Sequence, residues 1–258
     1  MPFDEYARRE IERVAKDRGW PAAALLAIVE VESGGRTHAV VNGRPEPLIR
    51  FEGHYFDRRL PSEKQAVARR EGLASPSAGA VKNPPGQAAR WRMLARAAAI
   101  DKQAAYESVS WGLGQVMGAH WEWLGYHSVE DLVKDARNGV YGQVRLMANY
   151  IEKAGLADAL KRQDWHTFAG GYNGPGYARN GYHTKMAAAY ERWSKAKPLP
   201  SVPTPTPRPD PSRAPKPAPA APQPSKAGIL AAILAALAAA GAWIVNLPCN
   251  LIGIFCGG

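Results

Sequence analysis

The chain has few of the residues that most often build a reactive centre or a covalent framework. Its 258 residues include only two cysteines, Cys249 and Cys256, and both lie close to the C-terminus. The preceding part of the chain therefore offers no disulfide framework and no thiol nucleophile, which suits synthesis in a reducing cytoplasm. Residues 1–20 carry charges throughout and lack an apolar core, so we expect no cleavable secretory signal.

The sequence also lacks the usual patterns of metal and phosphate chemistry. Its six histidines do not form the HExxH spacing of a zinc peptidase, and we find neither a Ser-His-Asp set nor a glycine-rich phosphate loop. We therefore expect no metal and no cofactor. The net charge of +10 indicates an anionic partner such as nucleic acid, a membrane surface or a bacterial cell wall. Because the basic pairs are dispersed, nucleic acid is not the expected partner.

Composition divides the chain into three parts. Residues 1–197 hold nearly all the aromatic side chains and are expected to form the globular domain. Proline dominates residues 198–226, which predicts an extended, semi-rigid spacer that cannot bury a core. In the last part, residues 227–258, an uncharged apolar run over 227–245 is long enough to cross a membrane as one helix. The alternative is an alanine-rich helix that packs on a partner.

Two helices are expected at the start of the chain. Residues 4–18 place apolar side chains at helical spacing among charges, which predicts an amphipathic helix. Pro21 suits the first turn of a second helix, and residues 22–31 are almost wholly apolar, as in a helix buried on every side. Gly34 and Gly35 can adopt the left-handed conformation that ends it.

The rest of the domain is predicted to be mostly helical, with a small β element. Residues 40–56 lack a helical period and contain a turn-like Asn42-Gly43 pair, which predicts a short β-ribbon or an ordered loop. Residues 62–85 are polar and end in the breaker Asn-Pro-Pro-Gly. The fold class is therefore α+β. Further helices are expected over residues 87–110, 128–137, 141–154, 164–169 and 182–195, with Ser128 and Asp164 as the caps of two of them.

Glu30 and Glu32 lie at the end of the apolar helix over 22–31. A carboxylate leaving such a helix is partly desolvated, which favours its neutral form and raises its pKa. A general acid for glycoside cleavage needs this property near neutral pH. Two positions on a helix differ by roughly 200° of rotation, so both side chains cannot face one cleft. For either residue the alternative is a solvated glutamate at a helix end.

Several sequence blocks resemble one family of cell-wall enzymes. ALLAIVEVESGG at 24–35, SWGLGQVMG at 110–118 and GYNGPG at 171–176 are similar to the signature blocks of goose-type lysozymes and soluble lytic transglycosylases. More closely, GRPEPLIRFEGHYF at 43–56 and GGYNGPGYARNGY at 170–182 resemble the N-acetylmuramidase domain of phage endolysins. The blocks occur in the same order, and the resemblance extends over most of the globular part.

The resemblance implies a lysozyme-like domain and a set of site residues. The catalytic glutamate of that superfamily directly precedes the serine of the E-S-G block, which corresponds to Glu32 rather than Glu30. The block that contains Ser110 and Gln115 is expected on the cleft wall, where the amide of Gln115 could donate to and accept from sugar groups. The alternative for Gln115 is a capping amide in a turn at a helix start. Tyr172 and Asn173 are expected beside the acid, with Tyr172 bonding either Glu32 or an N-acetyl group of the substrate. The alternative for Tyr172 is a buried tyrosine that anchors its loop.

Glu52 is the candidate for a second acidic role, because it lies in an otherwise apolar and aromatic segment. It would orient substrate or position a water molecule, and the alternative is a salt bridge to a nearby arginine. His54 and Glu107 are weaker candidates. Stacking on sugar faces is possible for three tryptophans, Trp111, Trp121 and Trp123. Core packing is nevertheless the expected role of most of them.

The expected activity is cleavage of the peptidoglycan glycan strand after N-acetylmuramic acid by a monomeric muramidase. Attack by water would make it a hydrolase, and attack by the muramic C6 hydroxyl a lytic transglycosylase. The alternative from another functional class is a lysis protein that binds the glycan but does not cleave it. Basic residues precede the apolar run and none follows it, so the positive-inside tendency predicts an anchor in the host inner membrane with the enzyme domain initially cytoplasmic.

Overall fold

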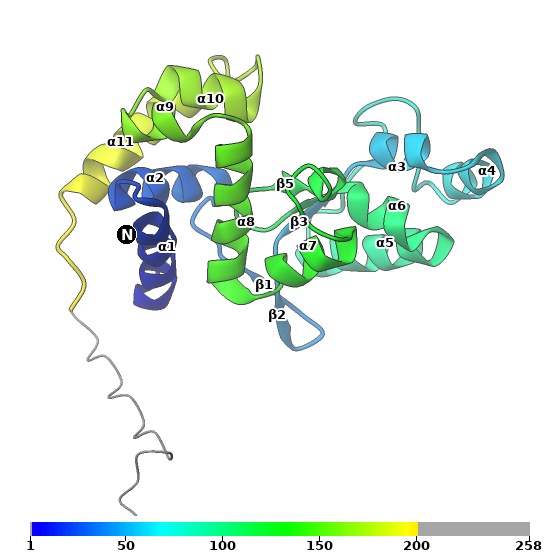
Figure 1. Cartoon of the computed structure of the whole chain (residues 1–258). Coiled ribbons are helices and arrows are strands. Elements are labelled where there is room, and N and C mark those ends of the chain that lie inside the picture. The colour runs from blue at the N-terminus through cyan, green and yellow to red at the C-terminus, as the bar shows by residue number, and fades with distance from the viewer. Residues whose placement is uncertain (1, 201–258) are drawn as a thin grey trace, which may run out of the picture. The chain divides into compact units, whose positions relative to one another are not determined.

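The computed structural model describes residues 2–200 (Figure 1). Apart from its first residues, the predicted spacer over 198–226 lies outside the described part, as does the predicted membrane segment over 227–258. Among the helices of residues 2–200, none combines the length and the apolar character needed to cross a membrane. The described residues form one compact unit with two hydrophobic cores.

The first two helices have the predicted bounds and ends. Helix α1 (Glu5–Arg18) begins where the Asp4 carboxylate accepts a hydrogen bond of 2.7 Å from the backbone N–H of Ala7. Helix α2 (Ala22–Ser33) follows Pro21, is buried over most of its length and ends at Gly34, whose φ is 61°. This ending sets the position of the last turn of α2, which carries Glu32.

The predicted ribbon is a β-hairpin. Strands β1 (Ala39–Val41) and β2 (Arg44–Glu46) pair antiparallel, with Val41 opposite Arg44. The predicted turn residues Asn42 and Gly43 both have positive φ, 50° and 75°, as a two-residue hairpin turn requires.

A second, three-stranded sheet joins distant parts of the chain. Strand β3 (Ile49–Phe51) pairs antiparallel with β4 (Val109–Trp111), which pairs with β5 (Val116–Met117). This sheet brings the segment around Glu52 next to the segment that contains Ser110 and Gln115, about sixty positions later in the sequence.

Two predictions for the middle of the chain were wrong in part. The β element predicted over 40–56 ends at Phe51, and helix α3 (Gly53–Arg59) follows it. Helix α4 (Ser62–Arg70), in the polar stretch that comes next, was not predicted. Burial of Phe56, Leu60 and Ala68 in the second core stabilises these short helices, and such tertiary contacts leave no clear period in the sequence.

The helix predicted over 87–110 is also not continuous. Helix α5 (Gln87–Ile100) stops at Asp101, whose extended backbone and side chain cap helix α6 (Lys102–Glu107) through a 3.0 Å bond to Ala104 N–H. The last predicted helical residues form strand β4 instead, because their backbone pairs with β3.

The C-terminal half is helical, as predicted, with two predicted caps present. Ser128 caps helix α7 (Val129–Ala136) through Asp131 N–H at 3.1 Å, and Asp164 caps α10 (Trp165–Asn173) through Thr167 N–H at 3.1 Å. The short helix α9 (Ala157–Lys161) was not predicted, and α10 extends further than expected. The remaining elements are the 3₁₀ turn η1 (Gly118–His120) and helices α8 (Gly139–Lys153) and α11 (Tyr182–Ser194).

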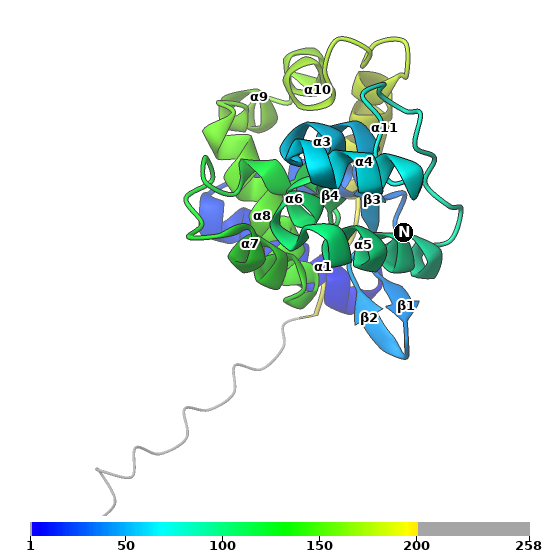
Figure 2. The same cartoon turned by 90° about the vertical axis from the view of Figure 1, so that its right-hand side faces the viewer.

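Helix α8 runs between the two cores (Figures 1 and 2). On one side it shares the first core with α1, α2, α10 and α11, and on the other side it shares the second core with the three-stranded sheet and α5 to α7. Met147 belongs to the first core and Leu146 to the second. The last turn of α2 and the end of α10 therefore meet the sheet of the second core beside α8.

Candidate active site

Glu32 lies in the last turn of α2, where the helix leaves the first core. Its Oε1 accepts a 2.8 Å hydrogen bond from Nδ2 of Asn173, the final residue of α10. Burial raises the pKa of the Glu32 carboxyl from 4.5 to about 7, although the Asn173 bond opposes this shift because it stabilises the ionised form. Near neutral pH this carboxyl group is therefore protonated in a large fraction of the molecules.

Glu30 faces a different part of the molecule, as the helical rotation between the two residues requires. Its carboxylate accepts a 2.7 Å bond from the indole N–H of Trp193 and forms an ion pair with Arg192, both on α11. Glu30 therefore fastens α2 to α11, whereas Glu32 has no cationic partner among the described residues.

Glu32 lines a hollow of about 380 Å³, which we call the acid cleft. Three of the residues predicted for substrate binding line it as well: Glu52, Ser110 and Gln115. Sequence reasoning missed other lining residues, since they come from scattered segments and form no local motif: Arg36, Arg50, Gln87, Arg90 and Tyr182. The cleft is polar and carries more positive than negative side chains.

Glu52 lies in the acid cleft and also forms the salt bridge that was the alternative to its predicted acidic role. Its Oε1 forms a 2.8 Å ion pair with Nε of Arg50. Its other oxygen is 3.8 Å from Nδ1 of His54. The structure thus brings a second carboxylate into the cleft of Glu32, with a cationic partner that Glu32 lacks.

Residues 112–115, between β4 and β5, form one wall of the acid cleft, and we call them the Gln115 loop. Gln115 has a positive φ of 48°, and its amide nitrogen donates a 2.8 Å bond to the carbonyl of Gly112. Gly114 allows the loop to approach α8, because a Cβ there would lie 2.7 Å from the side chain of Met147. Ser110 precedes the loop on β4 and is nearly buried, with its hydroxyl 3.1 Å from Sδ of Met117.

Tyr172 does not bond Glu32, which was one of the two roles suggested for it, and has instead the alternative role of a buried tyrosine that anchors its loop. Its hydroxyl donates a 2.7 Å hydrogen bond to the carbonyl of Gly114, and its ring stacks on Phe168. Burial, and then the nearby Glu32 charge, raise the pKa of Tyr172 well above its usual value of 10. Tyr172 therefore anchors the Gln115 loop to α10, and its neighbour Asn173 makes the contact with Glu32.

The weaker candidates have structural contacts. Glu107 accepts 3.0 Å bonds from Arg59 and from the indole N–H of Trp121, which join neighbouring elements of the second core. Trp111 is fully buried there. Trp123 differs from both tryptophans because 44% of its surface is exposed.

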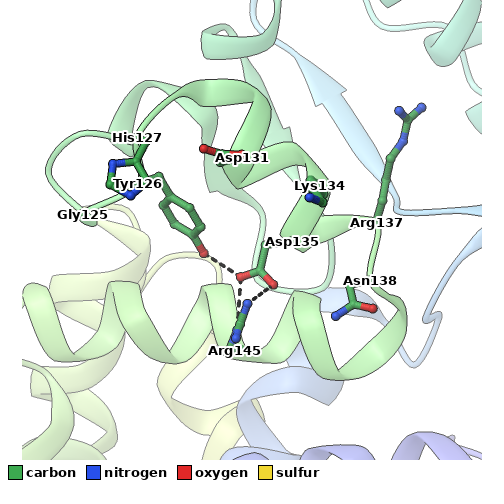
Figure 3. A pocket seen from close by; sticks show the side chains of 9 residues that line it. All are labelled: Gly125, Tyr126, His127, Asp131, Lys134, Asp135, Arg137, Asn138 and Arg145. Carbon is green, nitrogen blue, oxygen red and sulfur yellow. Dashed lines mark hydrogen bonds and ion pairs between the residues drawn. The ribbon is translucent and has the colours of Figure 1, made fainter.

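A larger hollow of about 720 Å³ lies beside α7 and α8 (Figure 3). The buried carboxylate on its wall, Asp135, accepts a 2.7 Å bond from the Tyr126 hydroxyl and pairs with the Arg145 guanidinium. These three groups satisfy one another, so none of them is available as an unpaired acid or base. Within residues 2–200, no three histidine, cysteine or acidic side chains gather as a potential metal site.

A neutral carboxylic acid beside a polar cleft is the arrangement that acid-catalysed glycosidases use. Comparison with family models agrees with this class: the N-acetylmuramidase model matches residues 21–194. The chain therefore belongs to the N-acetylmuramidase family, as its sequence blocks predicted. The family implies a glycoside hydrolase.

A solved structure gives the same result. The crystal structure of Burkholderia AP3 phage endolysin is 32% identical in sequence, with a TM-score of 0.64 over 73% of this chain and 71% of that chain. A search of curated proteins returned no match. The mostly helical domain predicted from the sequence is thus confirmed for residues 2–200.

Proposed function

We propose that the chain is a phage-type endolysin that cuts peptidoglycan between N-acetylmuramic acid and N-acetylglucosamine, with Glu32 as the general acid. Membership of the N-acetylmuramidase family and the likeness to a phage endolysin support the substrate class. The observation that carries the role of Glu32 is its pKa of about 7 at the edge of the acid cleft. Such a group is both protonated and acidic enough to donate near neutral pH.

The proposed reaction begins with proton transfer from Glu32 to the glycosidic oxygen, as the bond to the muramic C1 breaks and positive charge develops on that sugar ring. Asn173 already occupies Oε1, which leaves Oε2 to carry the acidic proton. Once the proton has moved, the Asn173 amide stabilises the carboxylate that remains, because hydrogen bonds to ionised groups are stronger than those to neutral ones.

Glu52 is the proposed second carboxylate. Its pairing with Arg50 holds it in the cleft, where it would position the attacking water or stabilise the positive sugar ring. Mass spectrometry of the released fragments tests the hydrolase assignment. We expect reducing muramic ends, whereas anhydro-muramic ends on every product would identify a lytic transglycosylase.

The role of Glu32 is tested by comparing Glu32→Gln with Glu30→Gln on purified cell walls. We expect Glu32→Gln to lower the rate of turbidity loss by about 10²–10⁴-fold, the usual contribution of a positioned general acid. Glu30→Gln is the matched control on the same helix and should stay within a few-fold of the wild type. Equal activity of Glu32→Gln and wild type would exclude Glu32 as the acid. A wild-type chain that binds walls without cleaving them would support a non-catalytic lysis protein.

We further propose, from composition alone, that residues 227–245 anchor the protein in the host inner membrane. The enzyme domain would initially be cytoplasmic and would reach the periplasmic wall only after the membrane is disrupted or the spacer is cut. Protease protection in intact host cells tests this arrangement. Digestion of the domain by external protease before lysis would exclude the cytoplasmic orientation.

A further inference from the structure

We propose that His120, Trp123 and Tyr150 form an aromatic platform that binds additional sugars of the glycan strand beyond the acid cleft. This inference rests on the proposed function, because it assumes that the ligand is an amino-sugar chain. It adds a second binding region on the far side of the Gln115 loop, and it predicts that long strands bind more tightly than short ones.

The first argument is the exposure and fixed orientation of Trp123. It is one of the few exposed large hydrophobic side chains of residues 2–200, with 44% of its surface accessible. Its ring lies 5.6 Å from the rings of both His120 and Tyr150, in edge-to-face geometry. These contacts restrict the indole while leaving much of it open to solvent. A rigid, exposed aromatic surface can bind a ligand at a low cost in conformational entropy.

The second argument is that the platform continues from the acid cleft. A smaller hollow of about 160 Å³ is lined by Gln115, Tyr172 and two members of the platform, His120 and Tyr150. Gln115 lines the acid cleft as well, so the two hollows share this residue in their walls. The Tyr150 ring lies 5.3 Å from that of Tyr172. A chain that leaves Glu32 past Gln115 would therefore meet Tyr150 and then Trp123.

The third argument is chemical. One face of an amino-sugar ring presents C–H groups, which are apolar and weakly positive, and these pack well on the electron-rich face of an aromatic ring. Burial, together with the charge of Arg59, lowers the pKa of His120, so its imidazole is uncharged near neutral pH. The platform thus offers neutral rings to the sugar faces, whereas the acid cleft offers mainly charged and amide groups.

The test measures binding of full-length protein to glycan strands from peptidoglycan, fractionated into short and long chains. All variants carry Glu32→Gln so that binding is separated from cleavage. We expect Trp123→Ala to weaken binding of long strands by about tenfold, as for the loss of one aromatic contact, and to leave short strands unaffected. Trp123→Phe should restore most of the affinity. Tyr6→Ala is the matched control, since Tyr6 is an exposed aromatic residue on α1.

Two outcomes would overturn the platform. One is unchanged binding of long strands by Trp123→Ala, and the other is an equal loss for short and long strands, which would indicate a general effect on the fold. Both are distinct from failure of the proposed function, which would appear as no cleavage of walls by the wild-type chain. Quenching of tryptophan fluorescence by long strands, absent in Trp123→Ala, would support the platform independently.

Discussion

Two regions of the domain each contain a largely buried carboxyl group, and they differ in the charged and hydrogen-bonding partners that they provide for it. Beside α7 and α8, Asp135 is 6% exposed and is bound by both Arg145 and Tyr126. In the acid cleft, Glu32 receives a single hydrogen bond from the neutral amide of Asn173. An ionised group removed from water is stable only when nearby charges and donors replace the lost hydration. The first region supplies these partners, and the second leaves a large fraction of the Glu32 carboxyl groups protonated near neutral pH.

The same contrast occurs within one turn of α2. Glu30 is paired with Arg192 and Trp193, and Glu32, two positions later, has no such partners among the described residues. Asp57 agrees with the pattern, because its hydrogen bonds to Arg69 lower the pKa of the aspartate. The difference teaches that burial alone does not mark a functional acid. The informative feature is burial without the compensating cation that structural carboxylates in this domain possess.

The largest effect on stability should come from removing the buried charge of Asp135, which Arg145 and Tyr126 stabilise. Asp135→Asn removes the charge that pairs with Arg145 and leaves a partly buried guanidinium without its partner. We expect the free energy of unfolding to fall by about 3 kcal/mol, the low end of the range for broken buried ion pairs, because the Arg145 side chain is 44% exposed. Urea denaturation measures the change. The control is Asp131→Asn, an exposed aspartate on the same hollow, and equal stability of the two variants would show that Asp135 is not a structural anchor.

Removing the ionisable carboxyl group of Glu32 from the acid cleft should instead raise the stability of the folded protein. The folded-state pKa of Glu32 lies above its ordinary value of 4.5, so ionisation costs stability as pH rises from about 4.5 through 7. A glutamine side chain cannot ionise, and Glu32→Gln should therefore stabilise the protein by up to about 3 kcal/mol near pH 8 and hardly at all near pH 4. Thermal unfolding at both pH values tests this. A destabilised Glu32→Gln variant at about pH 8 would contradict the account.

A smaller effect is expected when the hydrogen bond from Asn173 to Glu32 is removed. The Asn173 bond lowers the pKa of Glu32, so Asn173→Ala should raise it further. Because the acid must be protonated, the loss of kcat/KM on the alkaline side should move to higher pH. The pH profile of wall lysis measures this shift, with Asn180→Ala on the following loop as control. A lower activity with an unmoved alkaline limb would show that Asn173 does not tune Glu32.

Local physics was sufficient to predict much of this architecture. The caps at Ser128 and Asp164, the glycine end of α2 and the Asn42-Gly43 turn each depend on a few adjacent residues. The opposite orientation of Glu30 and Glu32 follows from helix geometry alone. The choice of Glu32 needed the resemblance to muramidases, since either glutamate could have been desolvated.

The remaining features depend on contacts between distant segments. Arg50 lies on β3 and Tyr182 begins α11, yet both line the acid cleft, and no spacing in the sequence relates them. Tyr172 was predicted beside the acid from its position in a motif, but the direction of its hydroxyl depends on the Gly114 carbonyl, which folding brings within 2.7 Å. Helices α3 and α4 were missed for a similar reason, because they are stabilised by the core rather than by their own pattern.

Direct titration of Glu32 is the most decisive measurement. NMR of the side-chain carboxyl carbons, assigned by comparison with Glu32→Gln, follows this group as the pH is changed. The structure predicts a midpoint of about 7 for Glu32. A midpoint near the ordinary value of 4.5 would mean that the carboxyl is ionised at neutral pH, and the proposal that Glu32 is the general acid would then have to be abandoned.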